Sequence, residues 1–116
     1  MRRSLTALFL LLLAALTLLA AGAGFRSRKL FDEHFQKHGR EFGNITQAEY
    51  LRLAQELRDA PVGGPILEAA KPGGVISRFD RRKSYFGAYD RDGTIRTFFI
   101  PNDGERYFRR QSTRPD

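Results

Sequence analysis

One short segment of the chain brings together side chains that could move protons and hold a phosphate. In Lys37-His38-Gly39-Arg40-Glu41-Phe42-Gly43 a histidine stands between two cations and next to a glycine. An imidazole titrates near neutral pH and can act as a general acid or base. Lys37 and Arg40 could neutralise the charge that a phosphate develops during its reaction. The alternative is that His38 is only a polar residue in the last turn of a helix, where the helix dipole favours a cation.

A second segment could bring a hydroxyl and an aromatic ring to the same place. Asp92-Gly93-Thr94-Ile95-Arg96-Thr97-Phe98-Phe99 predicts a turn that leads into a strand. Thr97 could donate a hydrogen bond to a phosphate oxygen, and Phe99 could stack on a base. Strict alternation places Ile95, Thr97 and Phe99 on one side of this strand and Arg96 and Phe98 on the other. The same alternation also explains Thr97 and Phe99 as a half-buried pair without any chemistry.

The charge balance favours an anionic partner. The chain has 20 basic and 13 acidic residues, and the basic residues are mostly arginine. Arginine makes forked contacts to phosphate, so a polyanion is the partner we expect, with Arg40, Arg78 and Arg96 as substrate-binding residues beside Phe99. A solvated cationic surface that only keeps the protein in solution is the alternative. His34 and His38 have the spacing of two zinc ligands, but no third ligand is signalled. We therefore predict neither a metal nor a cofactor, and we expect His34 to pack or hydrogen-bond on its helix.

The first residues predict an export signal. Arg2 and Arg3 precede an apolar run from Leu5 to Ala21, and Ala21-Gly22-Ala23 resembles a signal-peptidase site. We assign residues 1–23 to a signal peptide and residues 24–116 to one small domain that is periplasmic or secreted. An uncleaved membrane anchor is the alternative, and it would be the only membrane contact. The chain has no cysteine, so the domain must be held by packing and hydrogen bonds.

The remaining sequence predicts helices followed by strands. Helical spacing predicts a helix from about Ser27 to His38 that ends at Gly39, and a capping box of Thr46 and Glu49 begins a second helix from about Gln47 to Arg58. Ile66–Ala70 could form only a turn of helix. Aromatic and β-branched runs predict strands at Val75–Asp80, Ser84–Tyr89, Thr94–Ile100 and near Arg106–Arg110. The predicted fold is α+β: two N-terminal helices cover one face of a small antiparallel sheet of three to four strands, and the other face is left for a ligand.

The ordered set of motifs resembles the colicin D-like tRNase domain. It is also similar to the C-terminal nuclease domains of contact-dependent growth inhibition toxins, within the barnase-like nuclease superfamily. The resemblance spans residues 24–116. It is carried by Phe35, His38, Gly39, Phe42 and Gly43, then Thr46, Glu49, Tyr50, Leu51 and Ala54, then Asp92, Gly93, Ile95, Thr97 and Phe99, and finally Tyr107 and Phe108.

This resemblance implies a metal-independent ribonuclease toxin that cleaves tRNA. The 2′-hydroxyl would attack the neighbouring phosphate and leave a 2′,3′-cyclic phosphate. His38 and Lys37 match the family's catalytic pair, and Thr97 and Phe99 match its hydroxyl and aromatic positions. Phe35 stands where these domains can carry another lysine, so Arg40 or Arg96 would have to replace that cation. The resemblance also implies an acidic immunity protein as a partner. The alternative function is a noncatalytic basic module that binds nucleic acid or another anionic polymer.

Overall fold

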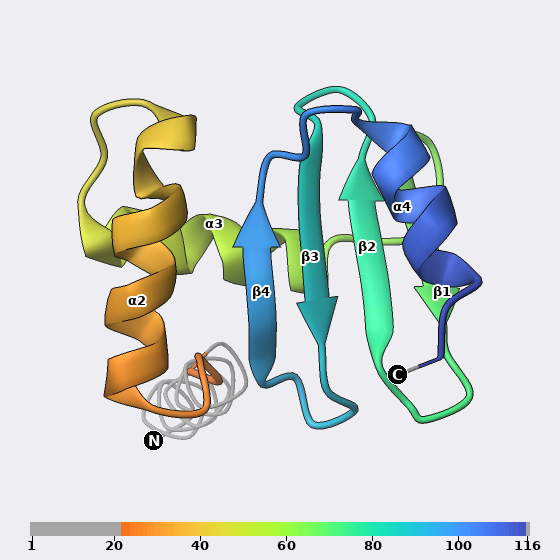
Figure 1. Ribbon diagram of the computed structural model, residues 1–116, viewed down its shortest axis with the longest axis horizontal. Helices are drawn as coiled ribbons and strands as arrows, with labels where there is room; N and C mark the ends of the chain where they lie inside the picture. Colours follow the sequence, from red (N-terminus) through yellow and green to blue (C-terminus); the bar gives the residue numbers. More distant parts are fainter. Residues whose placement is uncertain (1–21, 116) are drawn as a thin grey trace, which may run out of the picture.

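The computed structural model describes residues 22–115 as an α+β domain (Figure 1). The predicted signal peptide lies, apart from its last two residues, outside the described residues. Among residues 22–115 no helix is both long and apolar enough to cross a membrane. In chain order the elements are α2 (Arg28–His38), the 3-10 helix η1 (Gly39–Phe42), α3 (Gln47–Asp59), β1 (Ile66–Ala70), β2 (Ile76–Asp80), β3 (Tyr85–Tyr89), β4 (Ile95–Phe99) and α4 (Glu105–Ser112).

Both predicted N-terminal helices are present, and local hydrogen bonds fix where they begin. Ser27 caps α2 by accepting from the Leu30 backbone N–H at 3.1 Å, and Thr46 caps α3 by accepting from the Glu49 N–H at 3.1 Å. The end of α2 differs from the prediction in one respect. Gly39 has right-handed helical angles and continues into η1, so it is not a left-handed cap. A side chain there would come within 2.6 Å of the Phe35 ring, which explains the glycine.

The sheet is an antiparallel meander with the strand order β1-β2-β3-β4. The number of strands agrees with the upper end of the prediction. Three of the predicted segments are strands, but the fourth strand is a different segment from the one predicted. Ile66–Ala70, expected to form a turn of helix, is the edge strand β1, and Ile66 and Ala70 pair with Asp80 and Ile76 of β2. The segment is too short to indicate its own structure, so the hydrogen bonds that β2 offers decide it.

The segment predicted as a fourth strand is the helix α4, which follows the sheet. Glu105 lies in its first turn and Arg109 and Arg110 lie in its last turn, an order that the helix dipole favours. Phe108, only 6% exposed, packs with Phe79 and Phe86. The helix forms because it buries an aromatic side chain against an apolar sheet face that would otherwise contact water.

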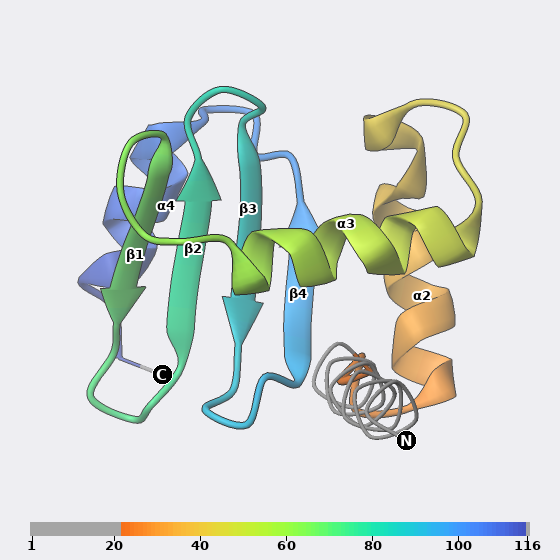
Figure 2. The ribbon, with the colours of Figure 1, turned by 180° about the vertical axis from the view of Figure 1, so that it is seen from behind.

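Helices therefore cover both faces of the sheet, which corrects the prediction that they cover only one. Figures 1 and 2 show α3 crossing one face, α4 lying over the β1–β2 part of the other face, and α2 standing beside the β4 edge. The larger core lies under α3. It consists of Tyr50, Ala54, Leu57, Tyr89, Ile95 and Phe98, all buried.

Two buried tyrosines tie α3 and the sheet together through backbone carbonyls. The Tyr89 hydroxyl donates to the Ala54 carbonyl at 2.8 Å, and the Tyr50 hydroxyl donates to the Phe98 carbonyl. Burial raises the pKa of both tyrosines well above its ordinary value, so both hydroxyls remain neutral donors.

A β-bulge at Arg96 decides which way the side chains of β4 face. Tyr89 pairs with Ile95, whereas its neighbour Ala88 pairs with Thr97, so Arg96 is an extra residue without an opposite partner. As a result Ile95 and Phe98 both point toward α3, while Thr97 and Phe99 point toward the α4 face. The expectation that Ile95 shares a side with Thr97 and Phe99 was wrong because it assumed unbroken alternation.

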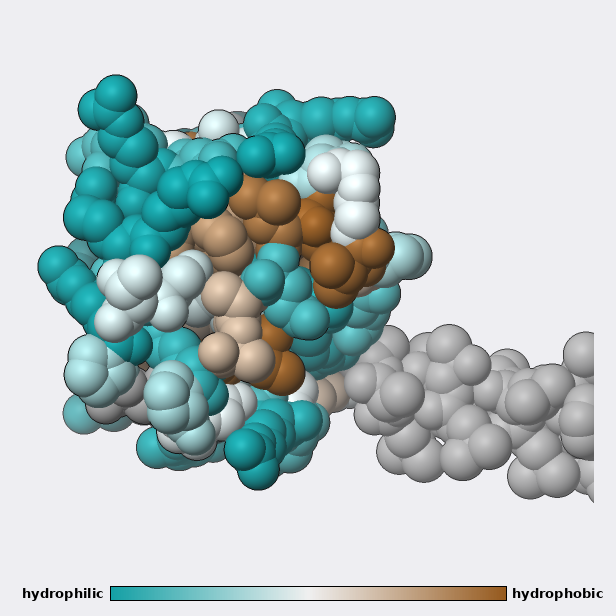
Figure 3. All heavy atoms as spheres, turned by 90° about the vertical axis from the view of Figure 1, so that its right-hand side faces the viewer, coloured by the Kyte–Doolittle hydropathy of each residue, from teal (hydrophilic) through white to brown (hydrophobic). Residues whose placement is uncertain are grey.

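The side of the molecule at the β1 edge carries apolar surface. Figure 3 shows hydrophobic side chains in the middle of this view with hydrophilic side chains around them. Val62, in the connector that precedes β1, is 56% exposed. Single exposed apolar residues are normal in soluble domains, and this face holds no histidine.

Candidate active site

A pocket of about 510 Å³ lies where α2, β4 and α4 meet. The last two turns of α2 form one wall. Side chains on the α4-facing side of β4 form another, and α4 contributes a tyrosine. Its volume falls in the range of small-molecule sites in proteins. The lining residues are Glu33, His34, Lys37, His38, Thr97, Phe99 and Tyr107.

His38, the last residue of α2, is held on two sides. Its Nδ1 lies 2.7 Å from Oε2 of Glu41, and its ring stacks on Phe99 with the centroids 5.0 Å apart and the planes at 25°. The side chain of His38 is 14% exposed. The other carboxylate oxygen of Glu41 accepts a hydrogen bond from the Ile100 N–H at 2.8 Å. Glu41 therefore connects the end of α2 to the end of β4.

His34 lines the same pocket one helical turn before His38. Its Nδ1 lies 2.8 Å from the Leu30 carbonyl oxygen, which agrees with the expected hydrogen bond on its own helix. The centroids of the two imidazole rings are 6.3 Å apart, and the Phe25 ring lies 4.9 Å from His34. Within residues 22–115 no three His, Asp or Glu side chains are grouped to hold a metal ion.

The charge of the pocket lining depends on the two histidines. Lys37 is a cation and Glu33 is an anion, and both line the pocket. These two formal charges cancel, so the lining becomes positive only when an imidazole takes up a proton. Phe35, at the position where a further lysine was considered, is partly buried and packs against the core, with its ring centroid 5.7 Å from that of Tyr50.

Thr97 and Phe99 reach the pocket because of the bulge at Arg96. Thr97 lines it, as does Phe99, whose ring contacts His38 and also lies 5.4 Å from the Phe86 ring and 5.1 Å from the Tyr107 ring. Aromatic neighbours thus surround much of the Phe99 ring that was expected to stack on a base. Tyr107 is a second aromatic in the lining.

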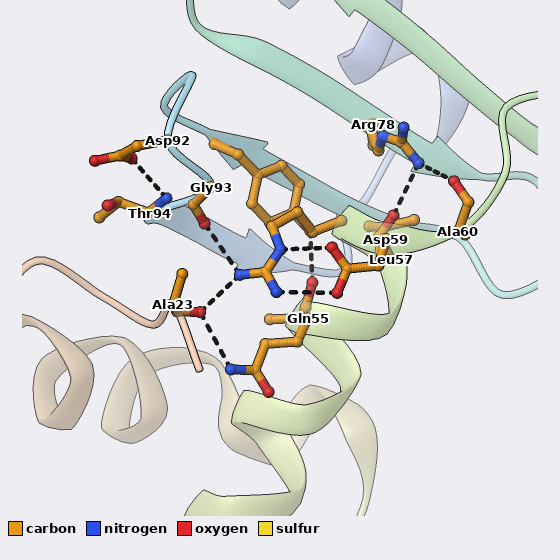
Figure 4. Close-up of polar contacts among 12 residues, drawn as sticks. Ala23, Gln55, Leu57, Asp59, Ala60, Arg78, Asp92, Gly93 and Thr94 are labelled. Carbon is orange, nitrogen blue, oxygen red and sulfur yellow. Dashed lines mark hydrogen bonds and ion pairs between the residues drawn. The ribbon is translucent and has the colours of Figure 1, made fainter. Parts of the chain in front are cut away.

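The three arginines predicted to bind substrate do not line this pocket. Arg40 is exposed in η1. Arg96 is the bulge residue, and it pairs with Asp90 at 2.9 Å. Arg78 faces the α3 side of the sheet, where it donates to the Leu57 and Ala60 carbonyls (Figure 4). It also pairs with Glu68 at 2.9 Å. With its side chain only 13% exposed, Arg78 joins α3 to β1 and β2.

Two other hollows in the described part of the chain are less suited to proton transfer. One of about 500 Å³ is lined by the β1–β2 and β3–β4 turns and includes Asp90, Arg91 and Arg96. It has no imidazole. The one between α3 and the β2–β3 turn measures about 160 Å³. The pocket of His38 is therefore the candidate site.

No protein-family model and no curated protein matches this chain. The resemblance to colicin D-like tRNases is therefore carried by the motif residues alone. Sequence reasoning had missed Glu41 and Glu33 as parts of the site. Glu41 follows His38 by three residues, a spacing that brings side chains together on a helix, so this contact could have been anticipated.

Proposed function

We propose that this protein is a metal-independent ribonuclease whose active site is the pocket of His38. The observation that supports this most is the convergence of Lys37 and His38 from α2 with Thr97 from β4 on one pocket. These elements lie some 60 residues apart in the chain. The set supplies a proton-transfer group, a cation and a hydroxyl within one space, and cleavage at a ribose phosphate needs these three functions.

In the proposed reaction His38 takes the proton from a ribose 2′-hydroxyl. The 2′ oxygen forms a bond to the adjacent phosphorus, and the bond from phosphorus to the 5′ oxygen breaks. The departing 5′ oxygen takes a proton, which leaves a 2′,3′-cyclic phosphate and a 5′-hydroxyl. Lys37 and Thr97 stabilise the negative charge on the non-bridging oxygens. His34, in the same lining, is the candidate for the proton donor, because the reaction needs an acid as well as a base.

The finer features of the proposal come from the resemblance. They are tRNA as the RNA that is cut, export through residues 1–23, action as a toxin in a target cell, and an acidic immunity protein in the producing cell. Phe99 was expected to stack on a base, but its ring already packs on His38. Tyr107, which also lines the pocket, therefore takes over part of this stacking in the proposal. Arg40, Arg78 and Arg96 are left without a role in the pocket, so contacts from these arginines to the reacting phosphate are no longer proposed.

The test is incubation of the protein with total tRNA in the presence of EDTA. We expect fragments that carry 2′,3′-cyclic phosphate and 5′-hydroxyl ends, and we expect His38→Ala to reduce the rate by about 10² or more. Arg52→Ala, on the exposed side of α3, is the matched control and should cleave like the natural protein. Intact tRNA, or equal cleavage by His38→Ala, would refute the proposal.

The same experiment distinguishes the alternative function. A noncatalytic basic module would bind tRNA without cutting it, and binding would survive His38→Ala. Its affinity would fall with rising salt concentration according to the number of phosphates contacted.

A further inference from the structure

The carboxylate of Glu41 links two elements of the candidate site, the end of α2 and the end of β4. It lies in η1, three residues after His38, and its side chain is one-third exposed. Oε2 lies 2.7 Å from Nδ1 of His38, and Oε1 lies 2.8 Å from the backbone nitrogen of Ile100. No other element contributes an acidic side chain bonded to His38 among the described residues.

The direction of both hydrogen bonds follows from the chemistry of the partners. An ionised carboxylate can only accept, and a backbone N–H can only donate. Ile100 therefore donates to Oε1, and His38 must carry a hydrogen on Nδ1 to donate to Oε2. A neutral imidazole has one N–H, so its Nε2 then has a free lone pair. The Phe99 ring stacks against the face of the same imidazole and restricts its rotation.

We propose that Glu41 is the positioning residue of this site and makes Nε2 of His38 the nitrogen that exchanges protons with the substrate. The role in a reaction rests on the proposed ribonuclease function, whereas the assignment of the hydrogen to Nδ1 does not. Glu41 does not touch the substrate in this proposal. It acts by holding the imidazole in one tautomer and by keeping α2 against the end of β4.

A glutamine at position 41 provides a sharp test because it retains the shape of glutamate and changes one hydrogen-bonding group. To keep the bond from the Ile100 N–H, the amide oxygen must face Ile100. The amide NH2 then faces His38 and can only donate. Both bonds survive only if Nδ1 of His38 becomes an acceptor, which moves the ring hydrogen to Nε2. Glu41→Gln should thus keep the fold and reverse the tautomer.

The experiment is 15N NMR of the histidine rings in the full chain, at a pH at which both rings are neutral. Two-bond hydrogen–nitrogen correlations tell which ring nitrogen carries the hydrogen. We expect Nδ1–H for His38 in the natural protein and mainly Nε2–H in Glu41→Gln. His34 is an internal control, because its Nδ1 is bonded to the Leu30 carbonyl and should stay Nδ1–H in both proteins. Glu33→Gln, which changes another carboxylate of the pocket, should leave His38 as Nδ1–H.

Two results would overturn the proposal: His38 as Nε2–H in the natural protein, or an unchanged tautomer in Glu41→Gln. Glu41→Ala is the second variant if the glutamine protein does not fold, and it should lower the fraction of Nδ1–H. In RNA cleavage, Glu41→Gln should lower kcat by about 10²-fold with little change in KM, since Nε2 is blocked while the lining stays intact. If the tautomers behave as expected but no protein cuts RNA, the ribonuclease proposal fails while the assignment of Nε2 stands.

Discussion

Replacing Arg58 with methionine should destabilise the domain more than any change to its exposed arginines. Arg58 lies near the end of α3 with its side chain 8% exposed. Its guanidinium donates to the Ala23 carbonyl at 2.6 Å and to the Gly93 carbonyl at 3.1 Å, and it forms two bonds to the Asp59 carboxylate (Figure 4). Arg58 thus holds the segment before α2 and the turn before β4. The helix α2 and the strand β4 are the elements that carry most of the candidate site.

The magnitude can be worked out from these contacts. A hydrogen bond from a charged donor contributes about 1.5–3 kcal/mol, and the two carbonyls together give about 3 kcal/mol at the lower end of that range. Asp59 is 55% exposed, so its ion pair adds only about 0–1 kcal/mol. Methionine keeps most of the apolar stem, so little packing is lost. The free energy of unfolding should therefore fall by about 3 kcal/mol, which corresponds to roughly 12–24 °C in Tm for a domain of this size.

The assay is urea unfolding of the full chain, in which Ala23 is retained, and of its Arg58→Met variant, followed by circular dichroism. Arg52→Met is the matched control on the same helix, because Arg52 is 60% exposed and its i,i+4 pair with Glu56 contributes about 0.3–0.5 kcal/mol. Hydrogen exchange gives a local measure. The Ile95 N–H is bonded to the Gly24 carbonyl at 2.8 Å and should exchange faster in Arg58→Met. A loss no larger than that of Arg52→Met would refute the reasoning.

Two further predictions concern stability. Gly87→Ala should lower the free energy of unfolding by about 1–3 kcal/mol, because the added methyl carbon would lie 2.2 Å from the hydroxyl of the buried Tyr89; thermal unfolding measures this loss. Hydrogen bonds from Arg81 and then Arg109 lower the pKa of Glu105 from its ordinary 4.5 to about 2. This carboxylate therefore stabilises the fold above about pH 4.5, and its contribution disappears as the pH falls toward 2, so unfolding titrations should show a smaller acid loss in Glu105→Gln.

Each of these has its own control. Gly24→Ala would meet only an ordinary contact at 3.6 Å from Leu51, so it should cost much less than Gly87→Ala. Equal losses in the two variants would contradict the role of the Tyr89 ring. For the acid titration, Glu56→Gln removes an exposed glutamate with a single arginine partner and should leave the acid loss nearly unchanged. An unchanged acid loss in Glu105→Gln would contradict the pKa argument.

The parts of the fold that the sequence predicted are those set by neighbours in the chain. Thr46 and Glu49 are three residues apart, and the capping bond between them needs no tertiary partner. The turn through Asp92 and Gly93 is equally local: the Asp92 carboxylate accepts from the Thr94 N–H at 2.9 Å, and Gly93 has a φ of +89°. Such patterns predicted both early helices and three of the four strands.

Pairing across the sheet decided what the sequence could not. Ile66–Ala70 became a strand because β2 offered it hydrogen bonds, and Phe108 became part of a helix because the sheet had a second apolar face to cover. A single residue, Arg96, was left out of the β3–β4 register. Alternation read from the sequence has no means of locating such an extra residue, since the partner strand defines it.

The candidate site divides in the same way. The sequence by itself determined that Lys37 and His38 end a helix and that Thr97 and Phe99 lie two positions apart on a strand, because helix ends and strand spacing are local properties. Only the tertiary structure decided that they share a pocket, that Arg78 points to the opposite face, and that Glu41 holds the His38 imidazole. The shared pocket depends on the direction in which the β4 side chains point. That direction is set by hydrogen bonds to β3 and by the burial of Ile95 and Phe98 under α3.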